Sequence, residues 1–216
     1  MALEEIAGQA RAALDAANAA REQALRDSRT LVRLCANAIR AAHRGDGGAA
    51  RELLDQAKAL HQAVRTYLAS HPGVYWAGYV QDAEKELAEA ACVCAALGGA
   101  PLPSPAELGL AVGPYLNGLG DAAGELRRHL LDRLRAGQPG RGEELLGLME
   151  DIYTLLASLD YPDALTGGLR RTADAVRATL ERTRGDWTAA LLQLRLTRAL
   201  QQAPGAPPEE AAPGAG

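Results

Sequence analysis

Four carboxylates fall into two pairs at helical spacing, each beside stretches rich in alanine, leucine and glycine. Glu86 and Glu89 are three residues apart in KELAEAACVCAALGG, and Asp121 and Glu125 are four apart in GLGDAAGELRR. Residues three or four apart share one face of a helix, so the two acids of each pair point the same way. A hard divalent cation, Mg²⁺ or Mn²⁺, accepts carboxylate oxygens and would offset their repulsion. The pattern makes these four acids candidate metal ligands.

The alternative is that these acids face solvent, as most helical carboxylates do. Inward-facing acids would favour the metal site, because a buried charge needs a counter-ion or a shifted pKa. A ferritin-like di-iron bundle is disfavoured, since no Glu is followed three residues later by His. A purely structural helical oligomer remains the fallback.

A second pattern is a stripe of arginines along the first long helix. Its members recur at spacings of three, four, seven and four, on a face roughly 60° wide at 100° per residue. They are Arg26, Arg29, Arg33, Arg40 and Arg44. Guanidinium groups grip phosphates, so the stripe, together with Arg127 or Arg128, is a candidate nucleic-acid surface. The competing reading is a solvated face balanced by acids of another helix.

Bulk composition favours one all-α domain. The 216 residues are 48% hydrophobic and only 4% aromatic, with no Phe, and Ala and Leu dominate over β-branched residues. The net charge of −4 gives no global attraction to nucleic acid. Three cysteines without metal-ligand spacing, the two Glu near the N-terminus and the lack of a membrane-length apolar run favour a soluble cytoplasmic protein.

Breaker residues divide the chain into seven predicted helices. Asp46 is the expected cap of the second helix, and Gly185 and Asp186 are expected to separate the sixth from the seventh. Glycines 118, 120 and 124 weaken the fourth helix and indicate close packing. Trp76 and Trp187 are expected to anchor the core. The helices are expected over residues 3–43, 50–71, 79–97, within 108–137, over 141–159, up to 185 and over 187–202, in a domain of residues 1–202 followed by a disordered Pro/Gly/Ala-rich tail, 203–216.

Four segments occur in a characteristic order and spacing: REQALRDSRTLVRLCANAIRAAHRG, GYVQDAEKELAEA, YLNGLGDAAGELRRHLLDRLRAG and LLGLMEDIYTLLASLDYPDAL. In this order and spacing the chain resembles the translin family over roughly residues 20 to 200. The resemblance implies a seven-helix bundle of long antiparallel helices that assembles, typically as a hollow octamer, around single-stranded RNA or DNA. Members similar to translin-associated factor X are Mg²⁺-dependent endoribonucleases. Their catalytic, metal-binding acids correspond here to Glu86, Glu89, Asp121 and Glu125. This chain departs from the family pattern in having ELAEA where an aromatic commonly separates the first two acids.

The resemblance leaves two readings of the function. In the first, the protein is an endoribonuclease that hydrolyses single-stranded RNA inside a homo-octameric shell. In the second, it is a shell that binds single strands without cleaving them.

Overall fold

The computed structural model describes residues 2–202, and the predicted tail, 203–216, lies outside them. The described residues form helices and no strands, which confirms the all-α expectation. Six helices are long and three are single turns. Their bounds are α1 (Leu3–His43), α2 (Gly47–Leu68), α3 (Pro72–Tyr75), α4 (Tyr79–Gly98), α5 (Pro105–Leu108), α6 (Val112–Arg135), α7 (Gly142–Ala157), α8 (Asp163–Thr166) and α9 (Leu169–Gln202).

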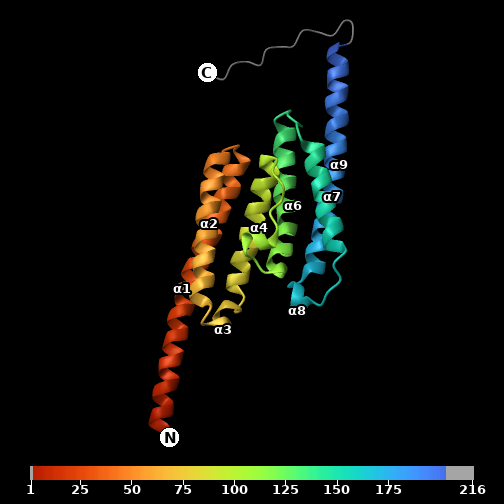
Figure 1. The fold of residues 1–216 in the computed structure, drawn as a ribbon. Helices are drawn as coiled ribbons and strands as arrows, with labels where there is room; N and C mark the ends of the chain where they lie inside the picture. The colour runs from red at the N-terminus through yellow and green to blue at the C-terminus, as the bar shows by residue number, and fades with distance from the viewer. Residues whose placement is uncertain (1, 203–216) are drawn as a thin grey trace.

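The long helices lie side by side, with α4 and α6 at the centre (Figure 1). The α1/α2 pair packs on one side of this centre, and α7 and α9 pack on the other. The N-terminal part of α1 and the C-terminal part of α9 extend beyond the bundle at opposite ends (Figure 1).

Helix direction differs from the expected antiparallel arrangement. Only α2 and α7 run against their neighbours, whereas α1, α4, α6 and α9 all run the same way (Figure 1). The connection between α4 and α6, residues 99–111, contains only the short helix α5. Thirteen residues span up to about 43 Å when extended, enough to return along the roughly 30 Å of α4 and start α6 in parallel.

The core is built mainly from alanine and leucine, as the composition predicts. One large cluster draws buried side chains from all six long helices, including Leu87 on α4, Leu126 on α6 and Met149 on α7. A smaller cluster joins Ala24 on α1 to Val64 and Leu68 on α2. Small side chains on α4, such as Ala83, Ala88 and Ala90, are almost fully buried. They allow the helix axes to approach closely.

Local signals explain several helix boundaries. Asp46 caps α2 as predicted, because its side chain accepts a hydrogen bond from the backbone N–H of Ala49 at 3.0 Å. Gly99 ends α4 in the left-handed region at φ 73°, where glycine is favoured. Ser104 and Glu107 form a reciprocal capping box on α5.

The predicted break at Gly185 and Asp186 is wrong, because α9 is continuous from Leu169 to Gln202. Tertiary contacts on both sides of the glycine hold the helix together. Thr183 and Trp187 are buried, and Asp186 pairs with Arg127 of α6. These side chains face the bundle together only if the helix continues without a break through position 185.

The two tryptophans behave differently. Trp187 is 3% exposed and packs where Gly142 begins α7, as expected of a core anchor. Trp76 is 62% exposed, so the prediction that it anchors the core is wrong. It lies at the C-terminal end of the four-residue helix α3, in which only Val74 and Tyr75 pack partly against the core. No helix within residues 2–202 has both the length and the apolar character needed to cross a bilayer.

Candidate metal and nucleic-acid site

Gly118 brings α6 close enough to α4 for their acidic faces to meet. A Cβ atom at this position would lie 2.3 Å from the Lys85 carbonyl oxygen and 2.7 Å from the Ala88 Cβ. Only glycine fits such an approach without a shift of backbone. Because the two helices are parallel, Asp121, nearly one turn after Gly118, faces the turn of α4 that carries Lys85 and Glu86. Its Oδ2 lies 2.6 Å from Lys85 Nζ.

The four acids act on one another electrostatically. The pKa of Glu89 is raised to about 8, first by burial and then by the charges of Glu86, Asp121 and Glu125. Burial also raises the pKa of Glu86, and Lys85 opposes that increase. Glu89 makes no hydrogen bond or ion pair with another described residue. It is therefore a half-buried carboxyl group surrounded by like charges, the arrangement that distinguishes the metal-site reading from acids facing solvent.

Glu125 links the acids to α1. Its Oε2 lies 2.6 Å from His43 Nε2, and the His43 side chain is only 11% exposed. Arg128 approaches the same oxygen at 3.6 Å. The His129 ring lies beside His43, with the ring centroids 5.8 Å apart. Burial and the neighbouring charges of His43 and Arg133 lower the pKa of His129, which favours its neutral form.

The chemistry of this donor set fits a hard divalent cation, since such ions prefer carboxylate oxygens and a positive charge would offset the burial and the like charges that act on Glu89. In the described residues, however, two of the four acids already pair with basic side chains of the protein. Lys85 holds Asp121, and His43 and Arg128 hold Glu125. No group of three His, Cys, Asp or Glu side chains in residues 2–202 is arranged to hold a metal ion. Ligation by all four acids would require the contacts of Lys85 and His43 to be exchanged.

The five arginines of the α1 stripe are all exposed. None has a carboxylate within ion-pair distance in residues 2–202, which opposes the reading of a face balanced by acids of another helix. Arg26 donates to Gln23 and Arg40 donates to Asn37. The buried face of α1, which includes Leu31 and Cys35, lies on the opposite side of the helix. The guanidinium groups are thus free to contact an external anion.

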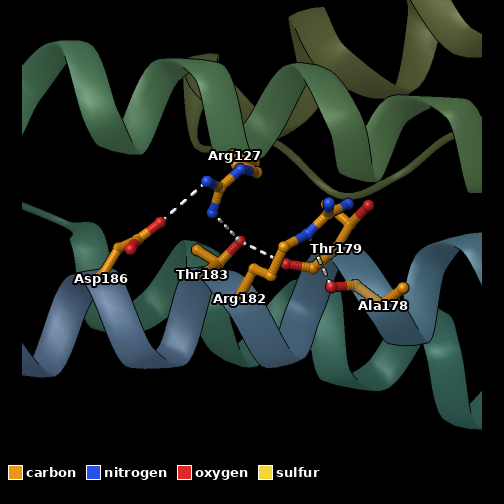
Figure 2. Close-up of polar contacts among 6 residues, drawn as sticks. All are labelled: Arg127, Ala178, Thr179, Arg182, Thr183 and Asp186. Atoms are coloured by element: carbon orange, nitrogen blue, oxygen red, sulfur yellow. Dashed lines mark hydrogen bonds and ion pairs between the residues drawn. The ribbon is translucent and has the colours of Figure 1, made fainter.

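Arg127 lies away from this surface. It donates to Thr183 Oγ1 at 3.0 Å and to Asp186 Oδ2 at 2.8 Å, both on α9 (Figure 2). Thr183 in turn donates to the Thr179 carbonyl at 2.6 Å. Arg127 lies two positions after Glu125, which rotates it about 200° around the helix. The structure therefore separates Arg127 from the predicted nucleic-acid surface, whereas Arg128 stays beside the acids.

Other polar residues near the site were not assigned a role from the sequence. His129 could have been identified as a site residue from the sequence, because it lies four residues after Glu125 on the same helical face. The ion pair of Lys85 with Asp121 could not be predicted from the sequence, since that contact depends on the direction of α6. His61 also has a partner: its Nε2 lies 2.9 Å from Oε1 of the fully buried Glu84, which also accepts from Tyr75.

No family model matches the chain. The chain is 31% identical over 185 residues to the uncharacterized protein MJ0175 of Methanocaldococcus jannaschii, covering 84% of this chain and 81% of that protein. The structure is similar to the crystal structure of AfC3PO, with a TM-score of 0.80 and 34% identity over 89% of this chain and 98% of that one.

Two further solved structures are similar. The complex of AfC3PO with duplex RNA gives a TM-score of 0.81 and 33% identity, over 89% of this chain and 98% of that one. Apo-NeC3PO, at 22% identity, shares the fold with a TM-score of 0.73, over 85% and 94% of the two chains. Since AfC3PO is a C3PO-like protein of the translin family, this chain belongs to the translin family.

Proposed function

We propose that this protein binds RNA through the α1 arginine stripe and cleaves it as a metal-dependent endoribonuclease within a homo-oligomeric shell, an octamer by resemblance to the family. The observation that carries the proposal is Glu89, whose pKa is raised by burial and by the three other acids around it. The α1 stripe supports the proposed RNA binding, because its five exposed guanidinium groups have no acidic partners in the described chain. AfC3PO has been solved with duplex RNA, so duplexes belong in the tests beside single-stranded RNA and DNA.

In this proposal the arginines position the RNA and the four acids bind the metal ion. Arg26, Arg29, Arg33, Arg40 and Arg44 position the phosphate backbone without reading its sequence, and Arg128 lies nearest the acids. Glu86, Glu89, Asp121 and Glu125 would hold Mg²⁺ or Mn²⁺. When bound, the metal supplies a water of lowered pKa and neutralises charge on the phosphate. His43 fixes the Glu125 carboxylate, and Lys85 pairs with Asp121.

A labelled RNA incubated with Mg²⁺ tests the proposal. We expect the parent protein to cleave it and Glu89→Ala and Glu125→Ala variants of unchanged assembly to lose cleavage. Glu52→Ala, at an exposed acid on α2, is the matched control and should cleave like the parent. Equal rates for the parent and both site variants would refute the metal-dependent mechanism.

The second candidate function is a shell that binds RNA without cleaving it. The contacts of Asp121 with Lys85 and of Glu125 with His43 favour it, since side chains of the protein already bind two of the four acids. This function predicts salt-sensitive RNA binding that persists in EDTA, with no cleavage products. Absence of RNA binding at low salt would refute both functions.

A further inference from the structure

The two helix ends that leave the bundle expose apolar side chains. On α1, Leu3 is 83% exposed and Leu14 is 69% exposed. On α9, Leu192, Leu196 and Leu200 are each about 60% exposed. The α1 extension is defined here as residues 3–19 and the α9 extension as residues 192–202. They project from opposite ends of the molecule (Figure 1), so they do not meet within one chain.

The apolar face of the α1 extension continues the face that the bundle buries. Inside the bundle, Ala24, Leu31 and Ala38 are spaced for burial on one side of α1. The same alternation of three and four residues runs back through Ala17, Leu14, Ala10 and Leu3. When one apolar stripe runs along the whole of a helix, the whole stripe is expected to pack against other protein surface. No described residue covers the stripe before residue 20.

The α9 extension carries a second apolar face. Leu180 and Trp187 bury one side of α9 in the bundle. Leu192, Leu196 and Leu200, each four residues apart, lie roughly 120° to 180° around the helix from that side. They therefore form a separate stripe that points away from the molecule's own core.

The charges of the two extensions are opposite. The α1 extension contains Glu4, Glu5 and Asp15 against a single Arg11. The α9 extension contains Arg195 and Arg198 and no acidic residue. Two α9 extensions would repel each other, and so would two α1 extensions, whereas one of each attracts.

We propose that the acidic α1 extension of one copy packs on the Leu192, Leu196 and Leu200 face of the α9 extension of a second copy. The contact is head-to-tail, so each copy offers one extension to each of two neighbours. Repetition of such a contact closes into a ring when the rotation permits. The inference rests on the assembly named in the proposed function, but it requires neither RNA binding nor cleavage.

Charge reversal tests the pairing, with particle mass measured by light scattering and helicity by circular dichroism. One variant reverses α1 (Glu4→Arg, Glu5→Arg, Asp15→Arg), a second reverses α9 (Arg195→Glu, Arg198→Glu), and a third combines both sets. We expect each single reversal to shift the parent oligomer to smaller species without loss of helicity. The combined reversal should restore the parent mass, because the two extensions are again opposite in charge.

Substitution of the apolar stripe gives an independent arm. Leu192→Gln with Leu196→Gln and Leu200→Gln should shift the mass in the same direction as the charge reversals. Leu155→Gln with Leu165→Gln, at exposed leucines elsewhere on the surface, is the matched control and should keep the parent mass.

Three outcomes would overturn the inference. The parent protein could be monomeric, the single reversals could leave the particle mass unchanged, or the combined reversal could fail to restore the parent mass. Loss of assembly on changing α9 alone, with no effect of changing α1, would instead indicate pairing between two α9 extensions. RNA cleavage measured on the same samples separates a failure of this interface from a failure of the proposed nuclease.

Discussion

Gly118 on α6 lies directly against the Lys85 carbonyl oxygen of α4, so that even a methyl group at position 118 would approach that oxygen to 2.3 Å. This contact sets the distance between the two helices that carry the acids. Substitution to alanine forces the helices apart or shifts the backbone, which typically costs about 1 to 3 kcal/mol. We therefore expect Gly118→Ala to lower the free energy of unfolding by about that amount and to weaken any metal-dependent activity.

Gly124, on the same helix, is the matched control for this measurement. It has open space where a Cβ would be placed, so Gly124→Ala should raise the free energy of unfolding by about 0.5 to 1 kcal/mol, the usual difference in helix propensity. Urea unfolding of both variants checks the pair. Equal effects at the two positions would contradict the close approach at Gly118.

Glu89 should make stability depend on pH. Its pKa is about 8 in the folded protein, against an ordinary value near 4.5, so between these values the folded state holds a proton that the unfolded state has released. Stability then falls as pH rises from about 5 to 8. Glu89→Gln removes this loss, and we expect it to stabilise the protein by roughly 1 to 3 kcal/mol more at pH 8 than at pH 5.5, after allowance for partial solvent screening.

Unfolding in urea at the two pH values, without divalent ions, measures this difference. Glu52→Gln removes an exposed acid away from the cluster and serves as the control. If Glu89→Gln and the parent lose stability in parallel over this range, the carboxyl group is not held protonated by its neighbours.

Gly185→Ala tests the continuity of α9. The glycine is exposed, lies within the helix and has no other side chain within 4 Å of the place that a Cβ atom would occupy. In a continuous helix alanine should raise the free energy of unfolding by about 0.5 to 1 kcal/mol. A decrease would indicate the helix break that the local Gly-Asp signal predicts.

Arg33 and Arg127 should separate RNA binding from stability. Arg33 is exposed on the α1 stripe, so Arg33→Ala should weaken RNA binding several-fold and reduce the salt dependence by about 0.7 in log–log slope, with little effect on folding. Arg127 is bound to Thr183 and Asp186, so Arg127→Ala should cost about 1 to 3 kcal/mol of stability and leave the RNA affinity unchanged. Fluorescence anisotropy over a salt series, with thermal unfolding, measures both. A reversed pattern would place the RNA surface on the α9 side of α6.

The sequence predicted what depends on residues near one another along the chain. Spacings of three and four identified the helices, the buried face of α1 and the shared faces of the two acid pairs, because a helix repeats every 3.6 residues. The Asp46 cap was predictable for the same reason, since a cap bonds to its own helix within a few residues. The exposed arginine stripe also followed from periodicity alone.

Tertiary structure decided the direction of each helix and its rotation against its neighbours. The parallel course of α4 and α6 pairs Lys85 with Asp121 and sets Glu89 among three other acids. It also turns Arg127 toward α9, where Asp186 and Trp187 hold the helix continuous through Gly185. These contacts join residues that are far apart in the chain, 59 positions for Arg127 and Asp186 and 82 for His43 and Glu125. They depend on how long connections such as 99–111 return, which local spacing does not encode.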